Sequence, residues 1–545
     1  MKKHILLSVA SVFMAFVINA QTNAIHLNSL GFLPQLKKTA VISRECSTFK
    51  ITNAATGAEV FSGKTEGPKY QQDVNQNVWY ADFSALTTPG EYVLEVPGVG
   101  KSVQFKIADD VFSFAAKTSM RAFYLWRCGT SVEGDFNGNH YHQDACHLED
   151  GFEDYTGEKG SQRDGTGGWH DAGDYGKYVV NAGVTVGVLF MAWDHFQPHL
   201  EKMKLDIPET APRFPDFLKE LKWETDWMLK MQYPDGSGKV SHKLTRTSFS
   251  PFIMADQDHE KRYFTEWSSA ATADFVAIMA MAARYFKPYD AEYAQKCLDA
   301  AWVSYRFLLE NPERKPFVQG DFKTGGYQTN DTDDRLWAAA EMWETTGNKT
   351  CLEDFEKRAA AINFVVEEDW DWRNVSNLGM FTYALSQQKG KNTGVEKSIQ
   401  TNLLKNADAL VEKARADVYS RPLGGRYYWG CNGTVARQTV NLQVANKIQP
   451  KKEYIETALS AVNHILGNNF YNRSYVTGLG VNPPMHPHDR RCGADNIKAP
   501  WPGYIVGGGH TATDWVDEQE SYSHNEIAIN WQAALVYALA GFAQF

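Results

Sequence analysis

Two acidic residues three positions apart are the first candidates for chemistry in this chain. Asp171 and Asp174 stand in the glycine-rich stretch 168–178 (GWHDAGDYGKY), directly before an apolar run that predicts a helix up to residue 196. If the stretch enters that helix, both carboxylates lie on one side of its first turn, where free N–H groups favour ionised acids. Such a pair can hold and deprotonate a water molecule. A plain turn with an N-cap has the same residue types, so the pair alone does not establish catalysis.

A third acid, Glu526, precedes the last apolar run of the chain, which predicts a helix over residues 527–542. A glutamate at a helix start can simply complement the helix dipole. To donate a proton instead, Glu526 needs a raised pKa, and the positive helix end acts in the opposite direction. Desolvation and repulsion from neighbouring carboxylates would have to outweigh that effect.

Between these acids, residues 474–490 form a proline-containing segment that ends in His488 and Arg490. The prolines restrict the backbone, and the two side chains offer fixed donors for hydroxyl groups or for charge balance. A single His-x-Arg pair is also common in purely structural settings.

The elements that must position these residues fall into two regions. Residues 22–108 show short alternating stretches separated by Pro-Gly turns, which predicts a small β-sandwich. From 109 to 545 the pattern becomes helical, with fully apolar segments alternating with amphipathic ones, as in an inner and an outer ring. Twelve helices are expected to start near residues 111, 174, 214, 266, 288, 334, 351, 376, 394, 438, 453 and 524.

The N-terminus and the composition limit the possible functions. Two lysines precede an apolar run over residues 5–18, which predicts a signal peptide over 1–20 and an exported, soluble protein. That run is short for a membrane span, and we expect no comparable run later and no membrane span. A net charge of −10 without a basic block argues against nucleic acid. The 16 Trp and 25 Tyr suit both a core and stacking on sugars.

Three ordered motifs together resemble glycoside hydrolase family 9, the cellulase family with an (α/α)6 barrel. They are the Asp-Ala-Gly-Asp-Tyr-Gly-Lys-Tyr stretch, the segment 474–490, and the spacing of Asp517, Tyr522 and Glu526. The β region resembles the immunoglobulin-like domain that precedes the barrel in one branch of the family. One position departs from the family pattern, because Gln532 stands where asparagine is expected, and this puts the local geometry in doubt more than the catalysis.

The resemblance implies an inverting mechanism. Asp174 would be the general base, Asp171 would help to hold the same water, and Glu526 would be the general acid. An inverting enzyme needs its acid and base on opposite faces of the sugar, roughly 6.5–9.5 Å apart, so that a water fits between. The resemblance further implies substrate-binding roles, which we assign to His488, Arg490, Tyr522, Trp429 and Asp517. Trp429 suits a core position as well as a sugar platform.

Two metal sites are expected. Cys128 and Cys146, with His147 and His170, can close a tetrahedral zinc site, although the two cysteines of an exported protein can equally form a disulfide. The resemblance favours structural zinc. Clustered carboxylates near residue 331 suit calcium, although helix capping explains some of them as well, and the expected ligands are Asp331, Asp333, Asp334 and Asp371. No organic cofactor is expected.

The sequence therefore predicts an exported endo-β-1,4-glucanase, acting on cellulose-like, mixed-linkage or xyloglucan β-glucans. An exo-acting β-glucanase, glucosidase or glucosaminidase of the same family is the alternative. A carbohydrate-binding protein without catalysis is a third possibility, which the joint presence of Asp171, Asp174 and Glu526 disfavours. We expect a monomer with its β-sandwich acting as a buttress to the barrel. His140 and His142, in the long loop 129–168, are expected to be solvated, although they can also shape one end of a groove.

Overall fold

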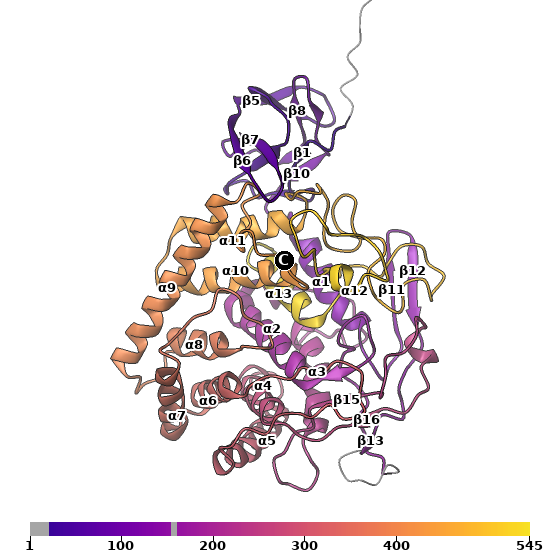
Figure 1. The fold of residues 1–545 in the computed structure, drawn as a ribbon, viewed down its shortest axis with the longest axis vertical. Helices are drawn as coiled ribbons and strands as arrows, with labels where there is room; N and C mark the ends of the chain where they lie inside the picture. The colour runs from indigo at the N-terminus through magenta and orange to yellow at the C-terminus, as the bar shows by residue number, and fades with distance from the viewer. Residues whose placement is uncertain (1–20, 154–160) are drawn as a thin grey trace, which may run out of the picture.

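The computed structural model describes residues 21–153 and 161–545 of the chain (Figure 1). A small β-domain stands at one end of a much larger helical domain, so the fold is mainly α with an N-terminal β-sandwich, as predicted. The signal peptide predicted over residues 1–20 lies outside the described residues. The exact domain limits at 22, 108 and 109 stay a prediction.

Two sheets form the N-terminal sandwich. One has the strand order β1-β3-β7-β6, and the other has the order β2-β10-β8-β4-β5 with β9 beside β8. The residues of β10 alternate between buried and exposed, and Phe105 packs edge-on against Phe32, 5.4 Å between ring centres, in the core between the sheets. The strands are β1 (Ile25–His26), β2 (Gly31–Phe32), β3 (Thr39–Ile42), β4 (Thr48–Asn53), β5 (Glu59–Lys64), β6 (Glu66–Gln71), β7 (Gln76–Asp82), β8 (Gly90–Val96), β9 (Gly100–Lys101) and β10 (Phe105–Ile107).

The sandwich packs directly on the helical domain. The Tyr80 hydroxyl donates to the carbonyl of Val418 (3.1 Å), and the Asn28 amide donates to the side chain of Asn463 (2.9 Å). An apolar cluster joins the two domains around these contacts, made of Val41, Val74, Val78, Val418, Tyr419 and Ala512. Tyr80 therefore lies in the interface between the two domains.

The helical domain is a closed double ring of helices. Each inner helix contacts the next in the order α2-α4-α6-α8-α10-α13, and α13 returns to α2. The outer helices α1, α3, α5, α7, α9 and α11 pack against this ring. The bounds are α1 (Ser113–Leu125), α2 (Val179–Leu200), α3 (Asp216–Met231), α4 (Ser269–Phe286), α5 (Ala291–Glu310), α6 (Thr332–Thr346), α7 (Lys349–Ala361), α8 (Ser376–Leu385), α9 (Thr393–Ala416), α10 (Cys431–Ile448), α11 (Lys452–Ile465), α12 (Tyr522–Asn525) and α13 (Ile529–Ala540), with a 3₁₀ turn η1 (Ala255–Gln257).

Burial explains the alternation that was visible in the sequence. Every residue of α4 from 269 to 283 is buried, whereas α3 buries one stripe that includes Phe217, Leu221 and Met228. The inner helix α2 is long and apolar enough to cross a membrane by length and composition. The expectation of no second apolar run was therefore wrong. Because 83% of the apolar window of α2 is buried inside the protein, the helix serves as barrel core.

Three predicted helix starts were displaced, and two of them matter for the site. Helix α2 begins at Val179 instead of 174, because residues 177–178 form strand β14, which pairs with β15. Helix α13 begins at Ile529, and Glu526 before it has extended backbone angles. The third, α10, begins at Cys431 instead of 438. The candidate acids therefore lie in the connections before the inner helices and outside the first helical turns.

Short strands fill the long connections around the site. A hairpin is formed by β11 (Val132–Phe136) and β12 (Asn139–Gln143), and a four-stranded sheet has the order β13-β16-β15-β14. Its strands are β13 (Phe152–Glu153), β14 (Lys177–Tyr178), β15 (Lys243–Thr245) and β16 (Tyr263–Phe264).

Candidate active site

Three segments that are distant in the sequence meet at one end of the inner ring. Ala172 forms a β-bridge with Ala528, and the backbone N–H of Ile529 donates to the carbonyl of Asp171 (2.9 Å). His488 forms a parallel bridge with Glu526. The predicted base turn, acid and His-x-Arg segment are thus joined by backbone contacts, which a sequence alone cannot show.

Gly173 marks how closely these segments approach. A Cβ atom added at Gly173 would lie 2.2 Å from the backbone carbonyl oxygen of His488. Only glycine permits this distance, because backbone atoms cannot move aside as a flexible side chain can. The glycine between the two candidate acids is therefore required by the packing of the segments.

Hydrogen-bond donors surround the carboxylates of the base turn. Asp171 accepts from the Asn181 amide (2.7 Å) and from the Tyr327 hydroxyl (2.6 Å). Asp174 accepts from the backbone N–H of Gly176 and from the Tyr178 hydroxyl, both at 2.9 Å. Burial and the charge of Asp174 raise the pKa of Asp171, while the donors from Tyr327 and Asn181 oppose that rise.

Glu526 has different surroundings. Loss of hydration and the negative charges of Asp174 and Asp171 raise its pKa well above the usual value, whereas Arg490 and a hydrogen bond with Trp429 act in the opposite direction. Because α13 starts three residues later, Glu526 is not the first residue of a helix. The conflict with the helix dipole that the sequence raised is therefore absent.

His488 and Arg490 both border the carboxyl groups. Arg490 is buried, and its guanidinium donates to the carbonyls of Gly173 (2.5 Å) and Ser250 (2.8 Å). One ring nitrogen of His488 hydrogen-bonds to the carbonyl of Gln519 (2.7 Å), and burial lowers the pKa of the ring. Arg490 therefore holds the base turn in place, in addition to any role toward a substrate.

Aromatic rings continue away from this pair. Trp429 and Tyr522 are 46% and 53% exposed and meet edge to face, 5.4 Å between centres. Phe249 and Phe252, which the sequence did not single out, are also exposed and lie 5.3 Å and 5.7 Å from the Arg490 guanidinium. Exposed rings beside the candidate acids are suited to stack on sugar faces.

Asp517, which was also expected to bind substrate, is instead surrounded by protein donors. Its carboxylate accepts hydrogen bonds from the backbone N–H groups of Met485 and His486 and from the side chains of Arg473 and Asn525. These bonds also hold its pKa below the usual value. Four protein donors bond to its oxygens, so Asp517 joins two loops, and its expected substrate-binding role stays a prediction.

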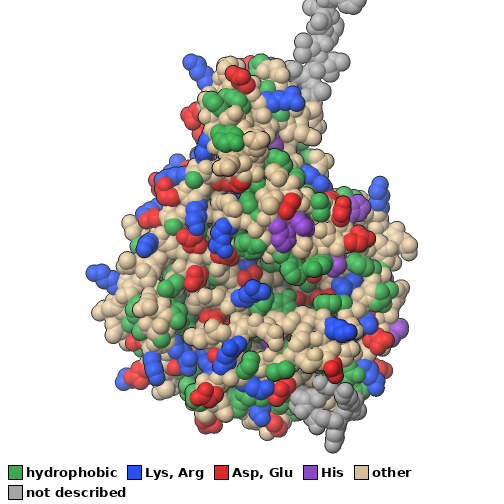
Figure 2. Space-filling view, viewed as in Figure 1, with side chains coloured by type: hydrophobic (Ala, Val, Ile, Leu, Met, Phe, Trp, Pro, Cys, Tyr) green, Lys and Arg blue, Asp and Glu red, His purple; other side chains and the backbone are tan. Residues whose placement is uncertain are grey.

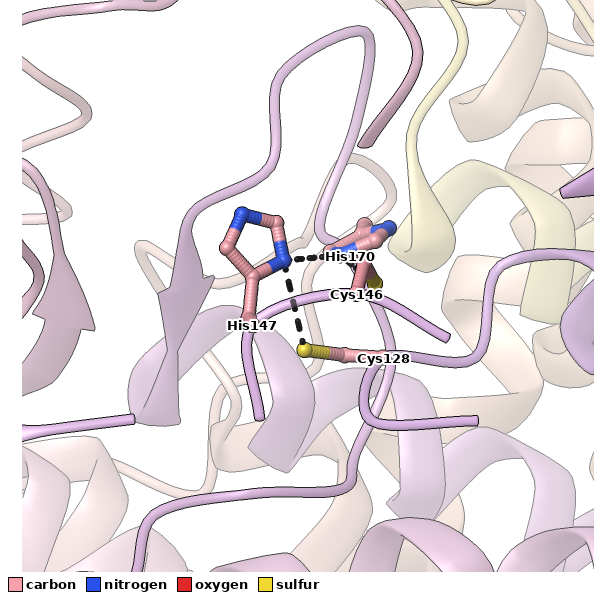
Figure 3. Close-up of side chains that lie close together, drawn as sticks. All are labelled: Cys128, Cys146, His147 and His170. Atoms are coloured by element: carbon pink, nitrogen blue, oxygen red, sulfur yellow. Dashed lines mark hydrogen bonds between the residues drawn. The ribbon is translucent and has the colours of Figure 1, made fainter. Parts of the chain in front are cut away.

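The four residues of the expected zinc site lie together in a buried cluster (Figure 3). His147 Nδ1 is 3.7 Å from Cys128 Sγ and 3.4 Å from His170 Nε2, and Cys146 Sγ is 3.7 Å from His170 Nε2. Tetrahedral zinc with bonds of about 2.3 Å to sulfur and about 2.0 Å to nitrogen sets its ligand atoms roughly 3.4–3.8 Å apart. Both cysteines are free thiols. The donor types and spacing of this Cys/His cluster therefore fit zinc.

The cluster also reaches the base turn. Its member His170 precedes Asp171, and its backbone N–H donates to the carbonyl of Trp126 (2.9 Å). On the other side, His147 Nε2 lies 3.6 Å from the carboxylate of Asp258. Metal-bound histidines commonly use the second nitrogen in this way.

The expected calcium ligands do not assemble. Asp331 pairs with Arg335 (2.6 Å), and Asp371 pairs with Arg437 (2.5 Å). Asp333 accepts from a backbone N–H, and Asp334 is buried beside Asp274. Among the residues that the structure describes, no group of three or more close metal ligands includes any of the four. The four aspartates instead make ion pairs, a backbone hydrogen bond and core contacts. The calcium prediction therefore has no support.

Comparison with known proteins agrees with this architecture. Residues 112–539 match the family described as glycosyl hydrolase family 9, and residues 20–101 match the cellulase N-terminal ig-like domain. The chain belongs to glycoside hydrolase family 9. As a member of this family, the chain is an enzyme of an inverting family. Its ring of helices is the (α/α)6 catalytic domain.

Individual family 9 relatives cover nearly the whole chain. "Endoglucanase D" of Acetivibrio thermocellus is 54% identical over 99% of this chain and 85% of its own length. A "Xyloglucan-specific endo-beta-1,4-glucanase BoGH9A" of Bacteroides ovatus is 34% identical over 94% of this chain and 92% of its own. Among solved structures, a zinc-binding triple mutant of the family 9 endoglucanase J30 matches with a TM-score of 0.88 and 29% identity, over 94% of this chain and 99% of that one.

The departure at Gln532 has a structural explanation. Its amide donates to the carbonyls of Ser119 and Gly503, both at 2.7 Å, and its oxygen accepts from the backbone N–H of Ile505 (3.1 Å). The side chain is fully buried, with these three bonds made to two separate segments. Gln532 therefore fastens a loop to α1, and none of these three bonds involves a candidate acid.

Proposed function

We propose that this chain is an endo-acting β-1,4-glucanase that cleaves β-glucan chains with inversion at the anomeric carbon. The observation that carries the proposal is the meeting of two kinds of carboxyl group at one end of the barrel. Asp171 and Asp174 accept four hydrogen bonds, and Glu526 is a desolvated acid beside their negative charge. The names of the relatives, an endoglucanase and a xyloglucan-specific endo-glucanase, support the same activity.

The residues then have complementary tasks. Asp174 takes a proton from the attacking water, and Asp171 helps to hold that water. Glu526 gives its proton to the glycosidic oxygen that leaves from the opposite face of the sugar. Each turnover breaks one glycosidic bond, adds the elements of water, and leaves Asp174 protonated and Glu526 ionised until proton exchange with solvent restores both.

The substrate is proposed to be an uncharged polymer. On the face shown in Figure 2, acidic and basic side chains are interspersed, and hydrophobic groups gather across the middle of the barrel region. The exposed rings of Trp429, Tyr522, Phe249 and Phe252 supply stacking surfaces. Mixed charge with exposed aromatic rings suits a neutral glucan better than a polyanion.

Zinc is proposed as a structural ion in the Cys/His cluster, held by Cys128, Cys146, His147 and His170. When bound, it would link segments 126–128 and 168–170 through its coordination bonds without contacting the reacting atoms. We expect Cys128→Ser to lose this ion and to lower the thermal midpoint by at least about 5 °C. Metal analysis and calorimetry check this, and a zinc-free protein with linked Cys128 and Cys146 contradicts it.

Export and a monomeric state complete the proposal, and the sandwich is proposed as a buttress. The interface around Tyr80 and Val418 supports the buttress, because it buries apolar groups from both domains. Deleting the sandwich up to residue 108 should therefore destabilise the barrel. A truncated protein with unchanged stability and activity contradicts the buttress.

Product analysis on a panel of soluble β-glucans tests the activity directly. An endo enzyme lowers the viscosity of barley β-glucan, carboxymethylcellulose or xyloglucan early and yields mixed oligosaccharides. A single small product from the first minutes supports the exo-acting alternative. No hydrolysis of any β-glucan by the folded protein contradicts both.

A further inference from the structure

The hairpin of β11 and β12 carries a second group of metal-ligand side chains on its outer face. Along β12, Tyr141 is buried while His140 and His142 are exposed, as expected for a strand with one packed face. The strand pairing places Glu133 directly across from His142 and Asp135 directly across from His140. Four potential ligands thus share one solvent-facing surface of the hairpin.

The ligand atoms are already close. Glu133, His140 and His142 each offer one atom within 4.8 Å of the other two. Nδ1 of His142 lies 4.0 Å from the Glu133 carboxylate, and the two imidazole rings are nearly parallel, 6.3 Å between centres. Zinc with bonds of about 2.0–2.1 Å to nitrogen needs its ligands roughly 3.4 Å apart. Exposed side chains can close that difference by small rotations.

Two further carboxylates orient the rings. Asp135 Oδ1 lies 2.8 Å from Nδ1 of His140, and Asp144 Oδ1 lies 3.1 Å from Nε2 of His142. Each carboxylate engages one nitrogen and leaves the other for a metal. Carboxylate–histidine–metal arrangements of this kind fix the ring and strengthen the ligand.

We propose that Glu133, His140 and His142 form a surface binding site for a divalent transition-metal ion such as Zn²⁺, separate from the Cys/His cluster. Two imidazole nitrogens select zinc, copper or nickel over calcium and magnesium, which require oxygen ligands. The carboxylates of Glu133, Asp135 and Asp144 add negative charge that favours a cation. Because the ligands are exposed, the ion exchanges readily with solvent.

The position of the hairpin gives the ion a structural effect. The hairpin connects Cys128 to Cys146, the two thiols of the Cys/His cluster. On its packed face, the Tyr141 hydroxyl donates to the carbonyl of Pro500 (3.1 Å), and its ring lies 5.4 Å from that of Trp501. An ion that joins β11 to β12 therefore stabilises the link between the Cys/His cluster and the loop 481–523 that leads to Glu526.

Zinc counting tests the site. The full chain is equilibrated by dialysis against about 50 µM Zn²⁺, and zinc per chain is measured by elemental analysis. We expect the His140→Ala/His142→Ala double variant to hold one zinc ion fewer than the wild type. His199→Ala removes an exposed histidine from α2 and should hold as much zinc as the wild type.

A second measurement separates binding from folding. Added zinc should raise the thermal midpoint of the wild type and leave that of the double variant unchanged, because an ion that binds only the folded state stabilises it. Glu133→Gln, a smaller change, should weaken the binding of the exchangeable zinc about tenfold. Equal zinc content in the wild type and the double variant overturns the proposal, as does an equal loss in His199→Ala.

Discussion

The two proposed sides of the active site surround their carboxyl groups with different sets of hydrogen-bond donors. On the base side, Asp171 and Asp174 accept hydrogen bonds from two side-chain hydroxyls, an amide and a backbone N–H. On the acid side, Glu526 has lost hydration and faces their negative charge, with one opposing hydrogen bond from Trp429. Donated hydrogen bonds favour the ionised form of a carboxyl group, whereas lost hydration and neighbouring negative charge favour the protonated form, and burial raises the pKa of Asp171 as well as that of Glu526. The proposed division into a base and an acid therefore rests on the hydrogen-bond donors around Asp171 and Asp174, of which Glu526 has fewer.

The two sides also differ in how they are held. The base turn follows His170 of the Cys/His cluster and is fastened by Arg490 through the Gly173 carbonyl. The acid is held by β-bridges of its own backbone to His488 and of Ile527 to Val506. Loss of a ligand from the Cys/His cluster should therefore displace the base turn more than it displaces Glu526.

The largest predicted effect breaks the base side. Asp174→Asn keeps an oxygen that accepts from Gly176 and Tyr178 but cannot take a proton, so hydrolysis of β-glucan should fall about a thousandfold. Initial rates measure the loss, and an unchanged thermal midpoint shows that the fold is intact. An Asp174→Asn enzyme with full rates would sink the assignment.

A smaller change sharpens the base side. Tyr327→Phe removes a donor to Asp171 that lowers the pKa of this acid, so the pKa of Asp171 should rise by about one unit. Asp171 must be ionised to help to hold the attacking water, so activity is lost as pH falls through the pKa of Asp171. The acidic limb of the pH–rate profile should then move to higher pH, while the alkaline limb stays in place. Movement of the alkaline limb alone would contradict the assignment of Asp171 to the base side.

The matched change on the acid side has the smallest expected effect. Trp429→Phe keeps an aromatic ring but removes the hydrogen bond that lowers the pKa of Glu526. The acid must be protonated, so activity is lost as pH rises through this pKa. The alkaline limb should therefore move to higher pH by less than about one unit. A shift of the acidic limb instead would contradict the assignment of Trp429 to the acid side.

Much of this arrangement could be predicted from the sequence. Helical periodicity predicted twelve helix starts, of which nine lie within three residues of the observed ones. The ordered motifs named Asp171, Asp174 and Glu526 as candidate acids. The Cys/His cluster followed from residue type and from the family resemblance. These features are local or carried by a motif, so one chain suffices to find them.

Other features depend on contacts between distant segments. Tyr327 and Asn181 donate to Asp171 from positions that no local pattern connects with it. The calcium prediction failed because Arg335 and Arg437 neutralise two of the carboxylates, and the second of these pairs is 66 residues apart. The start of α2 was misplaced because β14 pairs with β15, and such pairing competes with helix formation only in the folded chain.

The most direct test of the central claim compares leaving groups. Cleavage of a cello-oligosaccharide needs protonation of the glycosidic oxygen. The dinitrophenolate of a dinitrophenyl cellobioside departs as a stable anion and does not need this protonation. Glu526→Gln should therefore lose about a thousandfold on the first substrate and less than about tenfold on the second. Asp174→Asn should lose heavily on both, because both need an activated water. Equal losses of Glu526→Gln on the two substrates would contradict the division of the site into an acid side and a base side.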